Sequence, residues 1–422
     1  HLYDFSSSKP TYKLIYQEKS KTYIDVDDNL LILKDGKTIL RTSEMDGFKH
    51  IYKLGFDGSN VQITKGNWDV IDFLGIDENT ATIYYSSAEN SAIQKSTYSI
   101  RLDGTNKTEL TSERGYNEAD FLTGMKYFIR NYSNGNQPTV YSLCKNDGTK
   151  IRDLETNEEL KTKLKNYQLS KKEFLTIDAN GVKLNAWIIK PTNFDPTKKY
   201  PVYMTVYGGP GHNEVLDSWD GTDYMYHQLL AQKGYIVFSV DPRGTMYRGE
   251  AFKKSTYLQL GKLEIEDVIN TAKELQKLSY VDPSRIGIMG WSYGGFMSSL
   301  AITKGADVFK MSIAVAPVTN WRYYDNIYTE RFMRTPKENE DGYDRNSPIN
   351  YVDKIKGKYL LIHGSADDNV HYQNTMEMIS AMVKANKQFD LFIYPNKNHG
   401  IYGGNTRNHL FQMMLDYTLK NL

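Results

Sequence analysis

Short stretches of alternating hydrophobic and polar residues fill the first part of the chain. Three of them align with one another, at residues 51–60, 97–106 and 140–149, and each contains an Asp-Gly pair. The pairs recur after 46 and 44 residues. An Asp-Gly pair between alternating stretches is a hairpin signal, and a period near 45 is typical of β-propeller blades. We therefore expect a propeller; an open antiparallel sandwich with chance turns is the alternative.

This repeat region is short for a closed ring. A propeller needs roughly four to eight blades, and about 165 residues hold fewer than four at this period. The first recognisable strand, at residues 11–16, starts almost at the N-terminus. We therefore expect residues 1–165 to be the C-terminal blades of an incomplete propeller whose N-terminal blades are missing from this chain.

The pattern changes near residues 153–172. Residues 153–166 are polar and charged and are predicted to be a linker. Beyond them, buried strands alternate with helical stretches, which indicates a mostly parallel, doubly wound α/β sheet over residues 166–422. The predicted strands lie at residues 199–207, 235–240, 285–289, 311–315, 359–363 and 389–394, and the predicted helices at residues 265–277, 298–304 and 372–385.

Composition narrows the range of functions. Lys and Arg total 52 against 51 Asp and Glu, so the net charge of +1 argues against nucleic-acid binding. No run of about 18 apolar residues is present, so no membrane-spanning segment is expected. The single cysteine, Cys144, excludes an intramolecular disulfide and a cysteine-ligated zinc site.

A candidate nucleophile lies at residues 290–295, which read Gly-Trp-Ser-Tyr-Gly-Gly between a predicted strand and an apolar helical stretch. In this setting Gly-x-Ser-x-Gly is the sharp turn that presents a nucleophile in α/β-hydrolase folds. Glycine is needed on both sides because larger side chains would clash in so tight a turn. The helix N-terminus that follows favours a negative charge. We expect Ser292 to be this nucleophile; a Gly-Ser turn without chemistry is the alternative.

A serine hydroxyl becomes a good nucleophile when a base removes its proton. In this fold the acid and then the histidine follow the serine along the chain, and four histidines do so here. His399 follows the last predicted strand and is the favoured base, with His371 as a weaker alternative. His363 ends a buried strand and is expected to be a core residue, and His409 is expected to pack or to be solvated in the last helix.

The acid and the oxyanion donors are expected in loops after other strands. Asp367 and Asp368 both follow the penultimate strand, and spacing favours Asp367 only weakly. The acid would hold the imidazole tautomer and stabilise the imidazolium. The oxyanion needs preorganised donors. One is the backbone N–H of Tyr293; Tyr207, before a Gly-Gly pair, either offers its phenol as the second or merely ends its strand.

An aromatic segment lies between the nucleophile and the acid. Trp321, Tyr324 and Tyr328 are three and four residues apart, so on a helix they would share one face. That face would line an apolar pocket beside Ser292. Ordinary core packing is the alternative.

At these motifs the chain resembles the prolyl oligopeptidase family of serine peptidases, in its dipeptidyl peptidase IV branch. The resemblance covers essentially the whole chain, as the last propeller blades plus an α/β-hydrolase catalytic domain. The motifs that carry it lie at residues 241–244 (Asp-Pro-Arg-Gly), 290–295, 315–318 (Val-Ala-Pro-Val), 323–325 (Tyr-Tyr-Asp), 328–331 (Tyr-Thr-Glu-Arg), 363–371 (His-Gly-Ser-Ala-Asp-Asp-Asn-Val-His) and 398–400 (Asn-His-Gly).

The resemblance implies a role for each candidate residue. It implies a triad of Ser292, Asp367 and His399, which would settle the choice between the two aspartates. It implies that Tyr207 donates to the oxyanion beside the Tyr293 amide. It also implies a proline-shaped pocket and a residue that binds a substrate carbonyl. The pocket residues would be Tyr293, Val318, Trp321, Tyr324, Tyr328 and Val370, and the carbonyl would be bound by Asn369.

The implied activity is release of Xaa-Pro or Xaa-Ala dipeptides from peptide N-termini through an acyl-enzyme, without a metal ion or other cofactor. A related acylaminoacyl peptidase, prolyl endopeptidase or esterase is one alternative. A non-catalytic propeller protein that binds peptides is another. One feature departs from the family: relatives grip the substrate amine with a Glu pair from earlier blades, whereas the only adjacent pair in residues 1–170, Glu158-Glu159, lies in the linker.

The implied partners are peptides with Pro or Ala at the second position, and no nucleic acid. Relatives are often dimers, so the resemblance also implies a homodimer. The sequence leaves the compartment open, and the resemblance implies a periplasmic or extracellular one.

Overall fold

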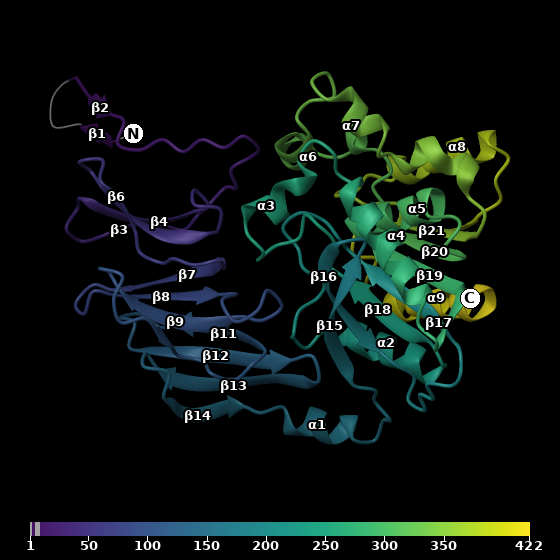
Figure 1. Cartoon of the computed structure of the whole chain (residues 1–422), viewed down its shortest axis with the longest axis horizontal. Helices are drawn as coiled ribbons and strands as arrows, with labels where there is room; N and C mark the ends of the chain where they lie inside the picture. The colour runs from purple at the N-terminus through teal and green to yellow at the C-terminus, as the bar shows by residue number, and fades with distance from the viewer. Residues whose placement is uncertain (1, 5–8) are drawn as a thin grey trace. The chain divides into compact units, whose positions relative to one another are not determined.

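The computed structural model describes residues 2–4 and 9–422 and divides into two compact units (Figure 1). The first unit comprises His1–Lys163 with two short segments from later in the chain, Leu216–Trp219 and Met246–Lys253. The second comprises Leu164–Val215, Asp220–Thr245 and Lys254–Leu422. Within the described residues, a helix long and apolar enough to cross a bilayer does not occur.

The described residues of the first unit form three four-stranded antiparallel sheets, each a meander of consecutive strands. The first sheet is β3 (Leu30–Ile32), β4 (Thr38–Ser43), β5 (His50–Gly55) and β6 (Asn60–Gln62). The second is β7 (Val70–Asp77), β8 (Thr82–Ser87), β9 (Ser96–Arg101) and β10 (Thr108–Glu109). The third is β11 (Tyr116–Phe121), β12 (Tyr127–Asn134), β13 (Gln137–Lys145) and β14 (Lys150–Glu155). A separate pair, β1 (Leu2–Asp4) and β2 (Thr11–Lys13), precedes them.

The repeated Asp-Gly turn occupies the same place in all three sheets, between the third and fourth strands. Gly58, Gly104 and Gly148 have φ angles of 95°, 85° and 88°, a region that glycine enters without strain. The predicted hairpins and blades are therefore confirmed, and each blade accounts for one period of the sequence.

An eight-stranded sheet forms the centre of the second unit, in the order β15-β16-β18-β17-β19-β20-β21-β22. The strands β17 (Tyr200–Val206), β18 (Ile236–Val240), β19 (Val281–Trp291), β20 (Met311–Val315), β21 (Lys358–Gly364) and β22 (Asp390–Tyr394) are parallel to one another. An antiparallel hairpin, β15 (Lys172–Ala179) and β16 (Val182–Ile189), completes the sheet at one edge. The predicted α/β-hydrolase fold is confirmed.

Helices cover both faces of this sheet, as two glycines of β19 show. A Cβ on Gly290 would collide with Gly294 in α5 (Tyr293–Lys304). A Cβ on Gly287 would lie 2.7 Å from Leu422, just after α9 (Thr406–Asn421). Because residues an odd number apart point to opposite faces of a strand, α5 and α9 lie on opposite sides. The other long helices are α2 (Thr222–Gln232), α4 (Leu263–Gln276) and α8 (Gln373–Lys384).

The structure differs from the sequence-based expectations at four places. The hairpin β15–β16 was not expected from the sequence pattern, and α5 begins at Tyr293 rather than at residue 298. The predicted linker holds the end of β14 and a short helix, α1 (Glu158–Leu164). The predicted single helical face at residues 321–328 is wrong: a 3₁₀ turn, Trp321–Tyr323, is separated from α6 (Asn326–Met333) by Tyr324, whose backbone is extended.

Candidate active site

The candidate residues gather at one edge of the second unit's sheet. Tyr207 follows β17, Ser292 follows β19, Asp367 follows β21 and His399 follows β22. Because these strands are parallel, their carboxyl ends meet at the same edge, where ligands of open α/β sheets bind. The topology thus accounts for how residues almost 200 positions apart in the chain come together.

Ser292 lies in a strained turn between β19 and α5. Its φ of 60° and ψ of −116° are rare for a residue with a side chain, and such strain concentrates at functional sites. The surrounding glycines make the turn possible: a Cβ on Gly294 would collide with the carbonyl oxygen of Val206, and one on Gly295 would lie 2.8 Å from Pro317. The turn therefore presents the Ser292 side chain at the N-terminus of α5.

Asp367 and His399 form a hydrogen-bonded pair. Nδ1 of His399 lies 2.7 Å from Oδ2 of Asp367. A carboxylate only accepts, so Nδ1 carries the proton and the opposite ring nitrogen, Nε2, is left as a base. The indole Nε1 of Trp291 donates to the backbone oxygen of His399 over 3.1 Å, which ties the histidine loop to the residue before Ser292.

The Asp367 carboxylate is buried and fully hydrogen-bonded. Oδ2 also lies 3.1 Å from Nε2 of His363, and Oδ1 accepts the backbone N–H groups of Asn369 and Val370, each over 3.0 Å. Burial opposes the charge, but the hydrogen bonds from His363 and His399 outweigh it and hold the pKa of Asp367 well below its usual range. Asp367 is thus a permanent anion that can stabilise a charged His399.

His363 therefore does more than fill the core. It is fully buried, and its Nε2 also lies 2.8 Å from the carbonyl oxygen of Val370. With two acceptors near Nε2, that nitrogen is the donor, and Nδ1 accepts from the hydroxyl of Thr375 over 2.8 Å. Sequence analysis placed His363 in the core and missed its contact with Asp367; the two residues are only four positions apart, a spacing that could have suggested it.

Tyr293 and Tyr207 lie where oxyanion donors would be needed. As the first residue of α5, Tyr293 has a backbone N–H without an intrahelical acceptor. The Tyr207 ring centre is 5.9 Å from the Tyr293 ring and 4.4 Å from that of His212. Burial, with the Glu214 carboxylate nearby, raises the pKa of Tyr207, so its hydroxyl keeps its proton and can donate.

The aromatic residues after β20 form one cluster despite the break at Tyr324. The Trp321 ring centre lies 5.3 Å from that of Tyr293, 5.7 Å from that of Tyr324 and 5.8 Å from that of Tyr328, which stacks on it. Two further candidate pocket residues, Val318 and Val370, are buried in the loops after β20 and β21. The cluster thus joins Tyr293, beside Ser292, to a set of flat apolar rings.

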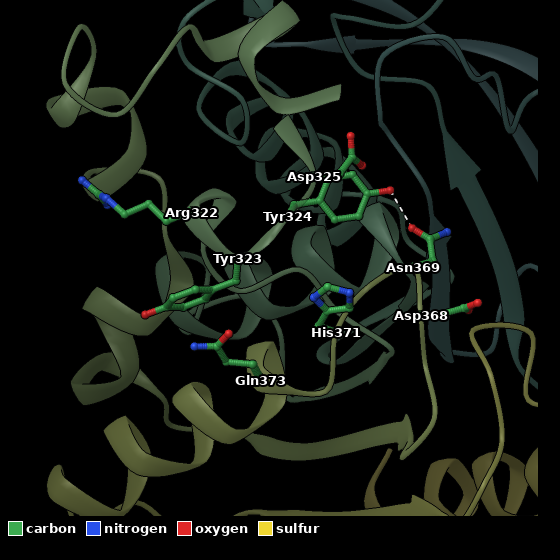
Figure 2. A pocket seen from close by; sticks show the side chains of 8 residues that line it. All are labelled: Arg322, Tyr323, Tyr324, Asp325, Asp368, Asn369, His371 and Gln373. Carbon is green, nitrogen blue, oxygen red and sulfur yellow. Dashed lines mark hydrogen bonds between the residues drawn. The ribbon is translucent and has the colours of Figure 1, made fainter. Parts of the chain in front are cut away.

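Next to this cluster is an open hollow of about 550 Å³. In Figure 2 the Tyr324 hydroxyl points toward the Asn369 amide, and the hydroxyl donates to Oδ1 over 2.7 Å. This bond leaves the Asn369 amide NH₂ group as a donor for a ligand carbonyl. The hollow is lined by Arg322, Tyr323, Tyr324, Asp325, Asp368, Asn369, His371 and Gln373.

The remaining candidates lie apart from the hydrogen-bonded pair. Asp368 is exposed, and it lines the hollow together with His371. His409 lies in α9, where its Nδ1 is 2.8 Å from the hydroxyl of Tyr394. The geometry thus favours Asp367 and His399 over these alternatives as the partners of Ser292.

In comparisons with known proteins, both parts of the chain match families of the same kind of peptidase. Residues 222–422 match the model of the prolyl oligopeptidase family, and residues 1–139 match that of the dipeptidyl peptidase IV N-terminal region. The solved structure of dipeptidyl peptidase 4 from Porphyromonas gingivalis superimposes with a TM-score of 0.93 at 44% identity, over 98% of this chain and 58% of that one.

Two curated relatives are fungal. The chain is 35% identical over 408 residues to a probable dipeptidyl-aminopeptidase B from Arthroderma otae, covering 94% of this chain and 44% of the relative. It is 36% identical over 371 residues to dipeptidyl peptidase 4 from Trichophyton equinum, covering 85% of this chain and 48% of the relative. The chain therefore spans a little under half the length of these relatives.

Proposed function

Because the chain belongs to the prolyl oligopeptidase family, we propose that it is a serine peptidase that releases dipeptides from peptides with Pro or Ala at the second position. The single observation that carries the proposal is the 2.7 Å hydrogen bond between His399 and the buried Asp367, at the sheet edge where Ser292 is presented. Such a pair turns a serine hydroxyl into a nucleophile.

The proposed reaction has two halves. Oγ of Ser292 attacks the scissile carbonyl while Nε2 of His399 takes the serine proton, and Asp367 stabilises the imidazolium that forms. The backbone N–H of Tyr293 and the phenol of Tyr207 donate to the oxyanion. His399 then gives its proton to the leaving amine, and an acyl-enzyme remains. A water molecule, activated in the same way, releases the dipeptide.

The aromatic cluster supports a preference for proline. The proline ring is compact and apolar, and it fixes the backbone φ angle. It therefore fits a slot between flat aromatic side chains with little loss of conformational freedom. Trp321 and Tyr328, whose rings stack at an angle of 22°, supply such a surface. The free NH₂ group of Asn369 would bind the carbonyl that precedes the proline.

The test is turnover of Gly-Pro-p-nitroanilide, with Gly-Leu-p-nitroanilide and acetyl-Gly-Pro-p-nitroanilide as comparison substrates. The wild type is expected to cleave the first and to react with a fluorophosphonate at Ser292. Ser292→Ala should lose about 10⁴-fold or more of kcat and all labelling while keeping its melting temperature. A protein that neither reacts with the fluorophosphonate nor cleaves Gly-Pro-p-nitroanilide would be a binding module, and equal cleavage of Gly-Leu-p-nitroanilide would contradict the preference for proline. Equal cleavage of the acetylated substrate would show that residues 1–422 do not recognise the free amine.

We also propose a homodimer that forms through β22, the outermost strand of the sheet. β22 is the last strand of the sheet, and an edge strand can pair with a strand of another chain. Exposed apolar side chains accompany it: Leu391 on β22 is 41% exposed, Val383 on α8 is 65% exposed and Leu419 on α9 is 43% exposed. Light scattering after size-exclusion chromatography should give twice the chain mass, and Val383→Glu with Leu391→Lys should give the monomer.

A further inference from the structure

A buried carboxyl group, that of Glu264, is hydrogen-bonded to the Tyr293 side chain and has no part in the reaction proposed above. Glu264, at the start of α4, is 0% exposed. Burial raises the pKa of Glu264 to about 7, against opposing hydrogen bonds from Gly261 and Tyr293. A carboxyl group removed from water destabilises the fold unless its hydrogen bonds replace those of water.

The hydrogen bonds of Glu264 are one-sided. Oε1 accepts from the hydroxyl of Tyr293 over 2.7 Å and from the backbone N–H of Gly261 over 3.0 Å. For Oε2, the described part of the chain offers no hydrogen-bond partner. A carboxyl group kept only for stability would be expected to use both oxygens, since a buried acceptor without a hydrogen bond destabilises the fold.

A neighbouring carboxylate shows what a structural role looks like on the same helix. Asp267, also in α4, is fully buried, and both of its oxygens bind the side chain of Arg243, at distances of 2.7 to 3.1 Å. Its Oδ2 also accepts the backbone N–H of Arg243 over 2.9 Å. Glu264 instead directs its one satisfied oxygen at the side chain next to Ser292.

Through its backbone and its ring, Tyr293 connects Glu264 to the oxyanion donors. Its backbone N–H is the candidate oxyanion donor, and its ring contacts those of Tyr207, Trp321 and Phe296, with ring centres 5.9, 5.3 and 5.4 Å away. The ring also lies against the backbone of Gly209, where a Cβ would come within 2.8 Å of Cγ. Fixing the phenol of Tyr293 therefore fixes a ring that touches both the second oxyanion donor and the wall of the aromatic pocket.

We propose that Glu264 is a positioning residue: its carboxyl group holds the Tyr293 hydroxyl so that the Tyr293 amide and the Tyr207 phenol stay aligned on the oxyanion. The inference rests on the proposed function, because it assigns Glu264 an effect on the chemical step. It predicts a loss in kcat with little change in KM, since an oxyanion donor acts mainly in the transition state.

The experiment compares Glu264→Ala, Glu264→Gln and Tyr293→Phe on Gly-Pro-p-nitroanilide, with melting temperatures for all. Glu264→Ala should lower kcat about 10- to 100-fold and change KM less than about threefold, the scale of a misaligned oxyanion donor. Glu264→Gln keeps an acceptor oxygen and should restore kcat to within about threefold of wild type. Tyr293→Phe should lower kcat about tenfold. Because the two residues act through one contact, the double variant with Glu264→Ala should have a kcat no lower than that of the less active single variant.

The matched control is Glu266→Ala, on the same helix, where the side chain is 51% exposed and its ion-pair partner is Arg243 at 3.9 Å. It should keep wild-type kcat. Wild-type kcat in Tyr293→Phe would overturn the proposal even if Glu264→Ala failed to fold, and so would a Glu264→Ala protein that melts earlier but turns over normally. If the wild type neither labels nor turns over, the proposed function fails first.

Discussion

The indole Nε1 of Trp291 donates a hydrogen bond to the backbone oxygen of His399 over 3.1 Å. The bond joins the loop after β22 to the turn after β19, so it constrains His399 relative to Ser292 independently of Asp367. The guanidinium of Arg407 lies over the same indole ring, 4.7 Å from its centre. Trp291 thus has a positional role that its place in the Gly-x-Ser-x-Gly motif does not require.

Trp291→Phe should lower kcat about fivefold with KM nearly unchanged, which corresponds to one hydrogen bond of about 1 kcal/mol. The phenyl ring keeps the apolar packing but cannot donate to His399. Steady-state kinetics on Gly-Pro-p-nitroanilide check this, with the melting temperature as the control for folding. A rise in KM at constant kcat would instead make Trp291 a wall of the substrate site.

A second prediction separates the two adjacent aspartates. Asp367→Asn should lower kcat by about 10⁴-fold, because an amide cannot hold the reactive tautomer of His399 or balance its charge. Asp368 is exposed, and it does not contact the four hydrogen-bond donors that surround the Asp367 carboxylate. Asp368→Asn should therefore be at least about a hundredfold more active than Asp367→Asn. Comparable losses in the two variants would contradict the assignment of Asp367 as the acid.

Tyr207→Phe should lower kcat by about 10²- to 10³-fold, as expected for one oxyanion donor, with little effect on KM. Its phenol keeps the proton because burial and the nearby Glu214 raise the pKa of Tyr207. The rate of acylation in a stopped-flow experiment is the direct readout. If only KM rises, Tyr207 is a binding or packing residue that merely ends its strand.

Much of this architecture follows from local patterns in the sequence. The turn at Ser292 was predictable because part of the steric exclusion is local: a Cβ on Gly290 would collide with Gly294, only four residues further on. The blades were predictable from local sequence too, since a tight turn that ends in Asp-Gly recurs in each of them. The hairpin β15–β16 had an equally strong signal, the Asn180-Gly181 turn with φ angles of 58° and 86°, but it was not recognised from the sequence.

Other features depend on contacts between distant segments. Glu264 and Tyr293 are 29 positions apart and meet only because α4 and α5 pack on the same face of the sheet. The segments Leu216–Trp219 and Met246–Lys253 belong to the first unit although the chain around them belongs to the second. The spacing of Trp321, Tyr324 and Tyr328 suggested a continuous helix, whereas their rings meet across a break that the spacing does not encode.

The last prediction uses the titration of Glu264. Burial raises the pKa of Glu264 from 4.5 to about 7, so the folded protein holds a proton that the unfolded chain releases near pH 4.5. A raised carboxyl pKa therefore favours folding at low pH, and that contribution is lost as the pH rises toward and beyond 7. The wild type should lose on the order of 3 kcal/mol of unfolding free energy relative to Glu264→Gln between pH 5 and pH 8.

Urea unfolding of both proteins at several pH values measures this difference directly. Subtracting the variant from the wild type removes groups common to both, such as Asp241, whose pKa burial also raises to about 7. Glu266→Gln, which changes the same charge at a half-exposed position on α4, should give a difference that hardly varies with pH. A wild type that gains stability over Glu264→Gln as the pH rises would mean that the Glu264 carboxyl is ionised in the folded protein. The Tyr293 hydroxyl would then face a full negative charge rather than a neutral acid.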